Sequence, residues 1–327
     1  METRPPPGPL LEIDQVSLAF GGVRALSGVG FEVAPGTITS VIGPNGAGKT
    51  SLFNTISGFY RPSAGAIRFE GRDITRLPAP RRAALGLARS FQNIALFRGM
   101  SVLDNIKLGR HAHLRTNVFD ALLYFGRARS EEIALRAEIE RRIIDFLEID
   151  HIRHAPVAAL PYGLQKRVEM ARALAMQPKV LMLDEPVAGM NREETEDMAR
   201  FILELRAEWG VTVLMVEHDM GMVMDLSDHV VVLNFGQVIA DGTPEQVQRD
   251  PEVIRAYLGS GDHEDLRRRL RGARGGNAPA VAADTDDGPA DDAAANGAIA
   301  AASAQGASKA PATTAPASTP PGKAAAT

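Results

Sequence analysis

The stretch from Val41 to Ser51, VIGPNGAGKTS, constrains the fold of this chain more than any other part of the sequence. It matches the pattern G-x-x-x-x-G-K-[ST] at Gly43, Gly48, Lys49 and Thr50. Glycines let successive backbone N–H groups curl around an anion, and a helix that starts there adds the positive end of its dipole. In this pattern the lysine reaches the β- and γ-phosphates and the threonine hydroxyl binds Mg²⁺. The stretch therefore predicts a site for a nucleoside triphosphate with Mg²⁺.

The residues on either side of this loop fit the same interpretation. Ile38 to Ile42 (ITSVI) is predicted to be a buried strand just before the loop, and Ser51 to Ser57 (SLFNTIS) suits a helix after it. A glycine-rich turn that arises by chance requires neither a strand before it nor a helix after it. The sequence therefore predicts the strand, phosphate loop and helix of a P-loop protein.

The composition excludes several other classes of protein. The chain has 327 residues, of which 45% are hydrophobic, and this suits one large or two ordinary globular domains. It contains no cysteine, which excludes disulfide frameworks and cysteine chemistry, and its net charge of −4 does not favour nucleic acid as a partner. There is no run of about 18 apolar residues and no apolar signal segment at the N-terminus. Any role at a membrane is therefore expected to depend on docking.

The N-terminal region predicts a small β layer that leads into the buried strand. Leu11 to Leu18 partly alternates apolar and polar residues, as an edge strand does, and Phe31 to Val33 is a second short strand. After the first helix, Ala66 to Phe69 is predicted to be a strand and Leu87 to Phe91 another. Pro78 to Leu85 suits a helix with proline in its first turn.

Residues 93–177 differ in character and predict a helical subdomain. Apolar residues recur there at spacings of three and four, as on the buried face of a helix. These residues are Ile133, Leu135, Ile139, Ile143, Ile144 and Leu147. The stripe predicts core packing rather than a cofactor site. Residues 111–130 have mixed polarity, and the sequence leaves open whether they form a helix or a long loop.

Two fully apolar runs in the second half of the chain predict central parallel strands, Val180 to Leu183 and Val211 to Val216. Arg192 to Glu208 and Met220 to Leu226 are predicted helices, and His229 to Ala240 is a hairpin around a glycine-containing turn. Helices and buried strands that alternate in this way indicate an α/β fold.

The two ends of the chain have the composition of unstructured segments. Residues 1–9 are rich in proline and are predicted to form a flexible arm. Residues 260–327 form a low-complexity tail with almost no large apolar side chains, so burial cannot offset the entropy of ordering and we expect disorder. The globular domain is therefore expected to span residues 10–259.

Acidic residues at the end of a central strand point to hydrolysis. Asp184 ends the run VLMLD, beside the P-loop strand if the sheet is parallel, and ligands of open α/β sheets bind at this edge. We expect Asp184 to hold Mg²⁺ through water and Glu185 to polarise the attacking water as general base. His218 ends the neighbouring strand, where a neutral imidazole hydrogen-bonds the γ-phosphate or the water. Gln92, at the end of a predicted strand, ligates Mg²⁺ or orients water through its amide.

Taken together, these motifs resemble the ATP-binding subunits of ABC transporters over residues 10–259. The resemblance implies an α/β P-loop NTPase (ABC ATPase) fold with a mixed central sheet, an N-terminal antiparallel β layer and a helical subdomain at about residues 93–177. It implies catalytic roles for Glu185, His218 and Gln92, and metal contacts from Thr50, Gln92 and Asp184. Phe20 stands where the family stacks an aromatic ring on adenine. The residues expected to bind ATP are Phe20, Gly43, Pro44, Asn45, Gly46, Ala47, Gly48, Lys49, Thr50 and Ser51.

The segment that matches the family's signature, LSGGQ, departs from the consensus. The matching residues are Leu160, Pro161, Tyr162, Gly163 and Leu164, followed by Gln165. In the consensus, the serine hydroxyl and glycine N–H groups reach the γ-phosphate bound by the opposite subunit, whereas Pro161 has neither a hydroxyl nor an N–H. A composite site that uses this segment is expected to close less tightly. The loop at Ala188 to Asn191 also departs from the usual SALD.

These departures, with ARSFQNIALFRGMSVLDNI and the ending VIRAYLG, resemble the LivG type, one of two ATPases of the high-affinity branched-chain amino acid importers. The resemblance implies ATP and Mg²⁺, a second ATPase subunit (a LivF-like sister or a second copy of this chain), two transmembrane permease subunits and, indirectly, a periplasmic solute-binding protein. It implies a peripheral position at the cytoplasmic face of the inner membrane and no nucleic-acid partner.

The sequence leaves other functions open. Related subunits serve importers of urea and other amides. A soluble ABC ATPase that acts on DNA or ribosomes usually carries two ATPase domains or a long coiled-coil insertion, whereas this chain has one P-loop and no heptad run. A protein that only senses ATP does not need Asp184, Glu185 and His218 together. A P-loop kinase has no use for the signature-like segment.

Overall fold

The computed structural model describes residues 8–90, 96–110, 137 and 139–259. The chain divides into two compact units, residues 1–277 and 278–327, and every described residue belongs to the first. The predicted flexible arm, except for Gly8 and Pro9, and the predicted tail lie outside the described residues. So do residues 111–130, for which the sequence left helix and loop open.

An antiparallel sheet forms the N-terminal layer, as the sequence predicts. Within the described part of the chain its strand order is β2-β1-β4-β5. These strands are β1 (Leu11–Phe20), β2 (Val23–Val33), β4 (Ala64–Phe69) and β5 (Arg72–Asp73). The prediction of an edge strand at Leu11–Leu18 is wrong, because β2 and β4 both pair with β1. The strand predicted at Phe31–Val33 starts eight residues earlier, where glycines and exposed residues weaken the strand pattern.

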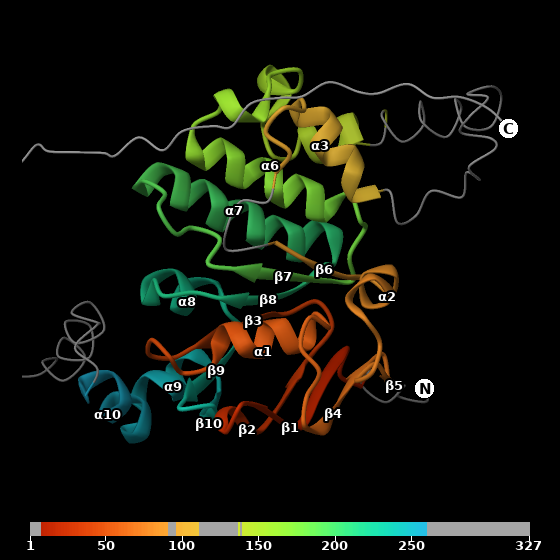
Figure 1. Ribbon diagram of the computed structural model, residues 1–327. Coiled ribbons are helices and arrows are strands. Elements are labelled where there is room, and N and C mark those ends of the chain that lie inside the picture. Colours follow the sequence, from red (N-terminus) through yellow and green to blue (C-terminus); the bar gives the residue numbers. More distant parts are fainter. Residues whose placement is uncertain (1–7, 91–95, 111–136, 138, 260–327) are drawn as a thin grey trace, which may run out of the picture. The chain divides into compact units, whose positions relative to one another are not determined.

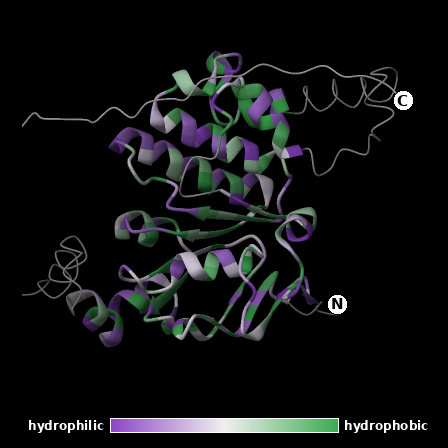
Figure 2. Cartoon of the chain, in the orientation of Figure 1, coloured by the Kyte–Doolittle hydropathy of each residue, from purple (hydrophilic) through white to green (hydrophobic). Residues whose placement is uncertain are grey.

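The second sheet is mixed and carries the P-loop strand. Its order among the described residues is β10-β9-β3-β8-β7-β6, and only the β9–β10 pair is antiparallel. The strands are β3 (Ile38–Ile42), β6 (Leu87–Arg89), β7 (Val180–Asp184), β8 (Thr212–Val216), β9 (His229–Asn234) and β10 (Gln237–Gly242). The expectation that the Asp184 strand lies beside the P-loop strand is wrong, because β8 lies between β3 and β7. All residues of β3, β7 and β8 are buried, and their ribbons are hydrophobic over most of their length (Figure 2).

Helices cover both faces of the mixed sheet (Figure 1). On one face lie α3 (Val102–Gly109), α6 (Tyr162–Leu174) and α7 (Arg192–Trp209). On the other face α1 (Lys49–Ile56) lies between the two sheets, and its Leu52, Phe53 and Ile56 join one core cluster with β1, β2 and β4. The remaining helices are α2 (Ala79–Ala84), α8 (Met220–Leu226), α9 (Pro244–Arg249) and α10 (Pro251–Gly259).

The apolar stripe predicted in the helical region packs into the core, as expected. A π-helical turn spans Glu140–Ile144, and short 3₁₀ turns span Asp150–Ile152 and Val157–Ala159. The stripe residues within the described part are all buried, namely Ile139, Ile143, Ile144 and Leu147. Ile133 and Leu135 lie outside the described residues.

A buried arginine joins α2 to the end of the P-loop helix. Arg82 donates to the carbonyl oxygens of Thr55 (2.8 Å) and Ile56 (2.7 Å) at the C-terminus of α1. It also donates to those of Leu77 and Thr75, each at 2.9 Å. The carbonyl of Thr55 also accepts from the backbone N–H of Gly58 at 3.3 Å, and the guanidinium adds a charged donor at this helix end. Burial lowers the pKa of Arg82 to about 10, which leaves it charged at neutral pH.

Replacing this arginine is therefore expected to loosen the base of the P-loop helix. We expect Arg82→Leu to lower the free energy of unfolding by about 3 kcal/mol, because it removes a buried charged donor that four carbonyl groups share. Urea unfolding of Arg81→Leu is the matched control, since Arg81 is exposed on the same helix and its loss is expected to cost under about 0.5 kcal/mol. Equal effects of the two substitutions would contradict the capping role.

Candidate functional site

The parallel strands bring the predicted site residues to one edge of the mixed sheet. Val41 of β3 and Asp184 of β7 both pair with Val216 at the end of β8. The P-loop, the Asp184–Glu185 pair and His218 follow these strand ends directly. Residues that lie more than 170 positions apart along the chain, such as Gly43 and His218, therefore meet at one edge.

Two glycines of the loop are required by its shape. Gly43 has φ +150°, and a Cβ there would lie 2.1 Å from the carbonyl oxygen of Leu233. Gly48, the N-cap of α1, has φ +104°, and a Cβ there would lie 2.7 Å from the carbonyl oxygen of Ala25. No side chain caps α1, so the N–H groups of its first turn are available to an anion.

Lys49 lies across the mouth of the loop. Its Nζ donates to the carbonyl oxygens of Gly43 (2.6 Å) and Pro44 (3.1 Å), and the residue is only 7% exposed. Burial lowers the pKa of Lys49, while the carboxylates of Glu185 and Asp184 act in the opposite direction. Backbone carbonyl groups at the start of the loop thus hold the ammonium group of Lys49.

The loop lines a cleft of about 580 Å³, a volume typical of small-molecule sites. Glu185 and His218 line it together with predicted ATP-binding residues, which are Asn45, Gly46, Ala47, Gly48, Lys49, Thr50 and Ser51. Val23, Arg24, Ala25 and Phe235 also line it, and the sequence analysis did not identify them. They come from the β1–β2 and β9–β10 hairpins, which no local motif connects to the P-loop.

Phe20, the residue predicted to stack on adenine, lies at the end of β1 outside the lining of this cleft. Its ring packs edge-on against Tyr60, with 5.1 Å between ring centroids, and it is 47% exposed. Its role in adenine binding stays a prediction. Gln92 lies outside the described residues, so its predicted contacts stay predictions too.

Asp184 is buried and has one paired and one unpaired oxygen. Its Oδ2 accepts from Arg89 Nη2 at 2.7 Å, and both side chains are less than a tenth exposed. Arg89 Nη1 donates to Asn54 Oδ1 (2.7 Å) and Ser57 Oγ (2.9 Å) on α1 and just after it. Asp184 Oδ1 is buried and has no hydrogen-bond partner among the described residues. Arg89 was missed in the sequence, where the only signal was a basic residue in the middle of the strand predicted at Leu87 to Phe91.

The unpaired oxygen of Asp184 is what a hard cation such as Mg²⁺ requires. Thr50, the other described residue predicted to contact the metal, lines the same cleft. Among the residues that the structure describes, no group of three or more acidic or histidine side chains forms a metal site. Mg²⁺ bound with a nucleotide takes one or two protein ligands and fills its shell with phosphate oxygens and water. The donor set therefore fits this ion.

Glu185 and His218 form a direct contact at the edge of the cleft. Glu185 Oε1 lies 2.7 Å from His218 Nε2. Glu185 has φ +50°, a left-handed conformation that costs a non-glycine residue free energy and recurs at functional sites. Its backbone N–H donates to the carbonyl oxygen of Val216, which holds the turn in place.

A second glutamate, Glu217, connects the loops that follow β7 and β8, which carry Glu185 and His218. It is buried, and it accepts from the backbone N–H groups of Val187 (3.1 Å) and His218 (2.9 Å). Burial raises the pKa of Glu217, and these backbone donors oppose the shift. The loop after β7 is thereby joined to the loop after β8. The sequence analysis did not identify Glu217, although it directly precedes His218.

The signature-like segment forms the start of α6. Pro161 is the N-cap, and the first intrahelical bond runs from the N–H of Gln165 to the carbonyl of Pro161. Proline removes one of the four unsatisfied N–H groups of a helix start, so those of Tyr162, Gly163 and Leu164 remain. Gln165 Nε2 donates to the carbonyl of Leu160 at 2.8 Å.

The start of α6 packs closely against the start of α7. A Cβ on Gly163 would lie 2.2 Å from Glu194 Oε1. Glu194 forms a capping box with Asn191, the last residue of the loop that departs from SALD. Asn191 therefore serves here as the N-cap of α7.

The chain matches known families over most of the described residues. Residues 26–188 match the ABC transporter family, and residues 237–263 match the family described as branched-chain amino acid ATP-binding cassette transporter. The chain is 45% identical over 253 residues to the high-affinity branched-chain amino acid transport ATP-binding protein BraF of Pseudomonas aeruginosa, which covers 77% of this chain and 98% of that protein. It is 43% identical over 256 residues to LivG of Escherichia coli K12, with coverage of 77% and 98%.

Solved structures show the same fold. A nucleotide-free ATP-binding cassette from an ABC transporter superposes with a TM-score of 0.67 at 33% identity, covering 77% of this chain and 99% of that one. The ADP conformation of an ATP-binding cassette of an ABC transporter gives the same values. The predicted fold class is thereby confirmed.

The buried pair of Arg89 and Asp184 is expected to be energetically coupled. Arg89→Met leaves a buried carboxylate without its cation and should lower the free energy of unfolding by about 3 kcal/mol. Asp184→Asn should lower the free energy of unfolding much less in the Arg89→Met protein than in the unchanged chain. A double-mutant cycle measured by urea unfolding is therefore expected to give a coupling of about 2 kcal/mol.

The partly exposed pair of Arg68 and Glu12, 2.6 Å apart, provides the comparison cycle; Arg68 also pairs with Asp14 at 3.2 Å. Solvent screening should keep the coupling between Arg68→Met and Glu12→Gln below about 1 kcal/mol. Additive effects of Arg89→Met and Asp184→Asn would show that the buried contact does not hold Asp184 in place.

Proposed function

The chain belongs to the ATP-binding subunits of ABC transporters, in their branched-chain amino acid group, and on that premise we propose that it hydrolyses ATP to power a membrane importer of branched-chain amino acids. The observation that carries the ATPase part is the convergence of Lys49, Asp184 and the Glu185–His218 contact at one strand edge. The substrate is proposed because the similar proteins BraF and LivG are named as branched-chain amino acid transport ATP-binding proteins.

The loop and Lys49 hold the phosphates of ATP in this proposal. The N–H groups that start α1 face the phosphate oxygens, and Lys49 exchanges its contacts with the carbonyls of Gly43 and Pro44 for contacts with the β- and γ-phosphates. Thr50, Asp184 and Gln92 are the residues that would hold Mg²⁺, which would supply positive charge against the phosphate oxygens.

Glu185 takes the proton of the attacking water as general base. His218 holds the carboxylate of Glu185 through the 2.7 Å contact and lies against the γ-phosphate side of the cleft. The strained backbone of Glu185 is explained by this role, because it directs the side chain of a strand-end residue towards the cleft.

A second ATPase subunit completes the site. The cleft has donors on the P-loop side, and the signature segment of a partner supplies donors from the other side. In return, Tyr162, Gly163 and Leu164 offer three N–H groups to the partner's ATP, one fewer than a helix without Pro161. We propose a LivF-like sister as this partner, with a second copy of this chain as the alternative.

The transport partners are two permease subunits in the inner membrane and, through them, a periplasmic solute-binding protein. Within the described ranges, no helix has the length and apolar character needed to cross a membrane. The chain is proposed to dock at the cytoplasmic face, with the helical subdomain at about residues 93–177 meeting the permeases. An amide or urea importer is the alternative, since this chain does not contact the solute.

Removing the general base should stop turnover and leave binding intact. We expect Glu185→Gln to lower the rate of ATP hydrolysis by about 10²–10⁴-fold, the usual contribution of a positioned base, with ATP affinity unchanged by calorimetry. Glu193→Gln, an exposed glutamate of the first turn of α7, should hydrolyse ATP at the rate of the unchanged chain. Comparable rates in Glu185→Gln and Glu193→Gln would refute the assignment.

Transport assays separate the two importer assignments. The chain is purified with candidate permeases and a candidate solute-binding protein and placed in liposomes. We expect ATP-dependent uptake of leucine, isoleucine and valine that the Glu185→Gln protein abolishes. Uptake of urea in place of leucine would replace the proposed substrate, and co-purification with ribosomes or DNA instead of permeases would refute the importer function.

A further inference from the structure

Two departures from the family consensus lie against each other in the structure. Tyr162 stands where the signature LSGGQ has its first glycine, and Gly189 stands where SALD has alanine. A Cβ on Gly189 would lie 3.2 Å from Cε1 of the Tyr162 ring. The side chain is therefore larger than the consensus on one side of this contact and smaller on the other.

Gly189 belongs to the loop that joins Glu185 to α7. Its φ of +79° is a conformation that glycine adopts without strain but also leaves easily, because no Cβ restricts its backbone. Within the loop, the N–H of Ala188 donates to the carbonyl of Glu185 at 3.3 Å, and that of Met190 donates to the carbonyl of Val187 at 3.1 Å. The first of these bonds is long, so a contact from outside the loop adds to its stability.

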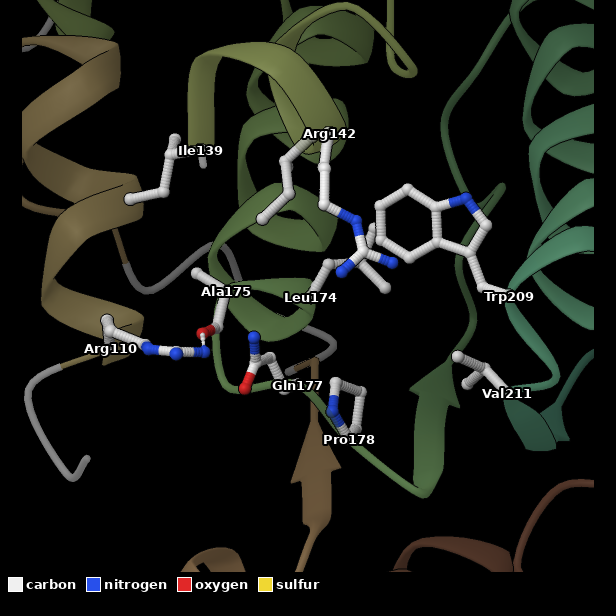
Figure 3. A pocket seen from close by; sticks show the side chains of 10 residues that line it. Arg110, Ile139, Arg142, Leu174, Ala175, Gln177, Pro178, Trp209 and Val211 are labelled. Carbon is white, nitrogen blue, oxygen red and sulfur yellow. Dashed lines mark hydrogen bonds between the residues drawn. The ribbon is translucent and has the colours of Figure 1, made fainter. Parts of the chain in front are cut away.

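The ring of Tyr162 makes this contact from a helix that is itself held in place. Tyr162 is the first residue of α6, and the start of α6 approaches Glu194 of α7 at Gly163. The last residues of the two helices, Leu174 and Trp209, line one cavity at the other end (Figure 3). The helix that carries the ring thus meets α7 near both of its ends.

Charged groups around Tyr162 show that the ring lies near the predicted general base. Lys166 Nζ lies 5.9 Å from the ring centroid, the distance of a cation–π contact. Burial raises the pKa of Tyr162, and the carboxylates of Glu169 and Glu185 act in the same direction. The phenol therefore stays neutral at neutral pH, and Glu185 is near enough for its charge to affect it.

The backbone of Glu185 needs support from the rest of its loop. Its φ of +50° costs free energy and persists only where the surrounding structure determines it. Glu217 holds the first part of the loop through the N–H of Val187. The Tyr162 ring contacts the second part at Gly189, four residues after Glu185. The two contacts together restrain the loop on both sides of its turn.

We propose that Tyr162 is a positioning residue for the general base, because its ring holds Gly189 and thereby keeps the turn that directs Glu185 towards the cleft. This role rests on the proposed function, in which Glu185 takes the proton of the attacking water. It acts within one chain, whereas the backbone N–H of Tyr162 serves the ATP of the partner.

Hydrogen exchange tests the contact in the full chain, without nucleotide or partner. We expect Tyr162→Ala to speed the exchange of the amide hydrogens of Ala188 and Met190 by about fivefold or more, because the loop opens more often. Leu203→Ala, which removes an exposed apolar side chain from α7, is the control and should leave this exchange unchanged. Unchanged exchange in Tyr162→Ala would overturn the proposal, whatever the chain does with ATP.

Rates of ATP hydrolysis show whether the contact acts on Glu185. The chain is assayed with an excess of a partner subunit whose general base is replaced by glutamine, so that Glu185 of the test chain is the base that works. We expect Tyr162→Ala to lower kcat by about tenfold at an unchanged KM for ATP, because the phosphate loop and Lys49 stay intact. Tyr162→Phe, which keeps the ring, should recover most of the rate.

An unchanged kcat, an effect on KM alone, or no recovery in Tyr162→Phe would overturn the positioning role. Failure of the unchanged chain to hydrolyse ATP with either proposed partner would refute the proposed function instead, and hydrogen exchange would still decide the contact.

Changes at Gly189 test the same contact from its other side, even if Tyr162→Ala fails to fold. Gly189→Ala places a Cβ 3.2 Å from the ring and strains a left-handed backbone, so kcat should fall. Adding Tyr162→Gly restores the consensus pair and removes the close approach, so the double variant should be faster than Gly189→Ala alone. A double variant that is as slow as Gly189→Ala, or slower, would contradict the proposal.

Discussion

The parallel alignment of β3, β8 and β7 is the constraint on which the rest of the site depends. It places the ends of three strands at one edge, so that the phosphate loop, Asp184, Glu185 and His218 meet there, and the loop, Glu185 and His218 line one cleft. A shift of β8 by one residue would turn every buried side chain of that strand to the other face and move His218 away from Glu185. The apolar faces of the sheet fix this register, because one packs against α3, α6 and α7 and the other packs against α1 and the antiparallel sheet.

Buried polar contacts then hold in place the residues that the strand register brings together. Arg89 connects β6, α1 and Asp184, and Glu217 joins the two loops that carry Glu185 and His218. Arg82 caps the far end of α1. Each of these side chains is ionisable and largely buried, and each acts on a residue that faces ATP in the proposed function or on the helix beneath it. The phosphate loop is thus held at its start by the close backbone approach that Gly43 allows, and at its end by the contacts of Arg89 and Arg82 with α1.

The sequence predicted where the helices and strands lie along the chain better than it predicted which strands lie side by side in the sheets. The strand at Ile38–Ile42 was predicted from its place directly before the phosphate loop, and the strand at Val180–Leu183 was predicted from a continuous apolar run. The structure contains both, as β3 and β7. Strand order depends on contacts between distant segments, so the place of β8 between β3 and β7 and the internal position of β1 were not foreseen. Arg89 and Glu217 were missed for the same reason, since Arg89 lies 95 residues from Asp184 and a local pattern cannot show the pairing.

The central proposal is that the P-loop of one chain forms only part of an ATP site. The most direct measurement is the rate of ATP hydrolysis per mole of chain at protein concentrations that span a hundredfold range, with and without the proposed sister subunit. The account predicts a rate per mole that rises with the concentration of the chain or of the added partner and then saturates. A substantial rate per mole that stays constant on dilution, and that the partner does not change, would contradict it.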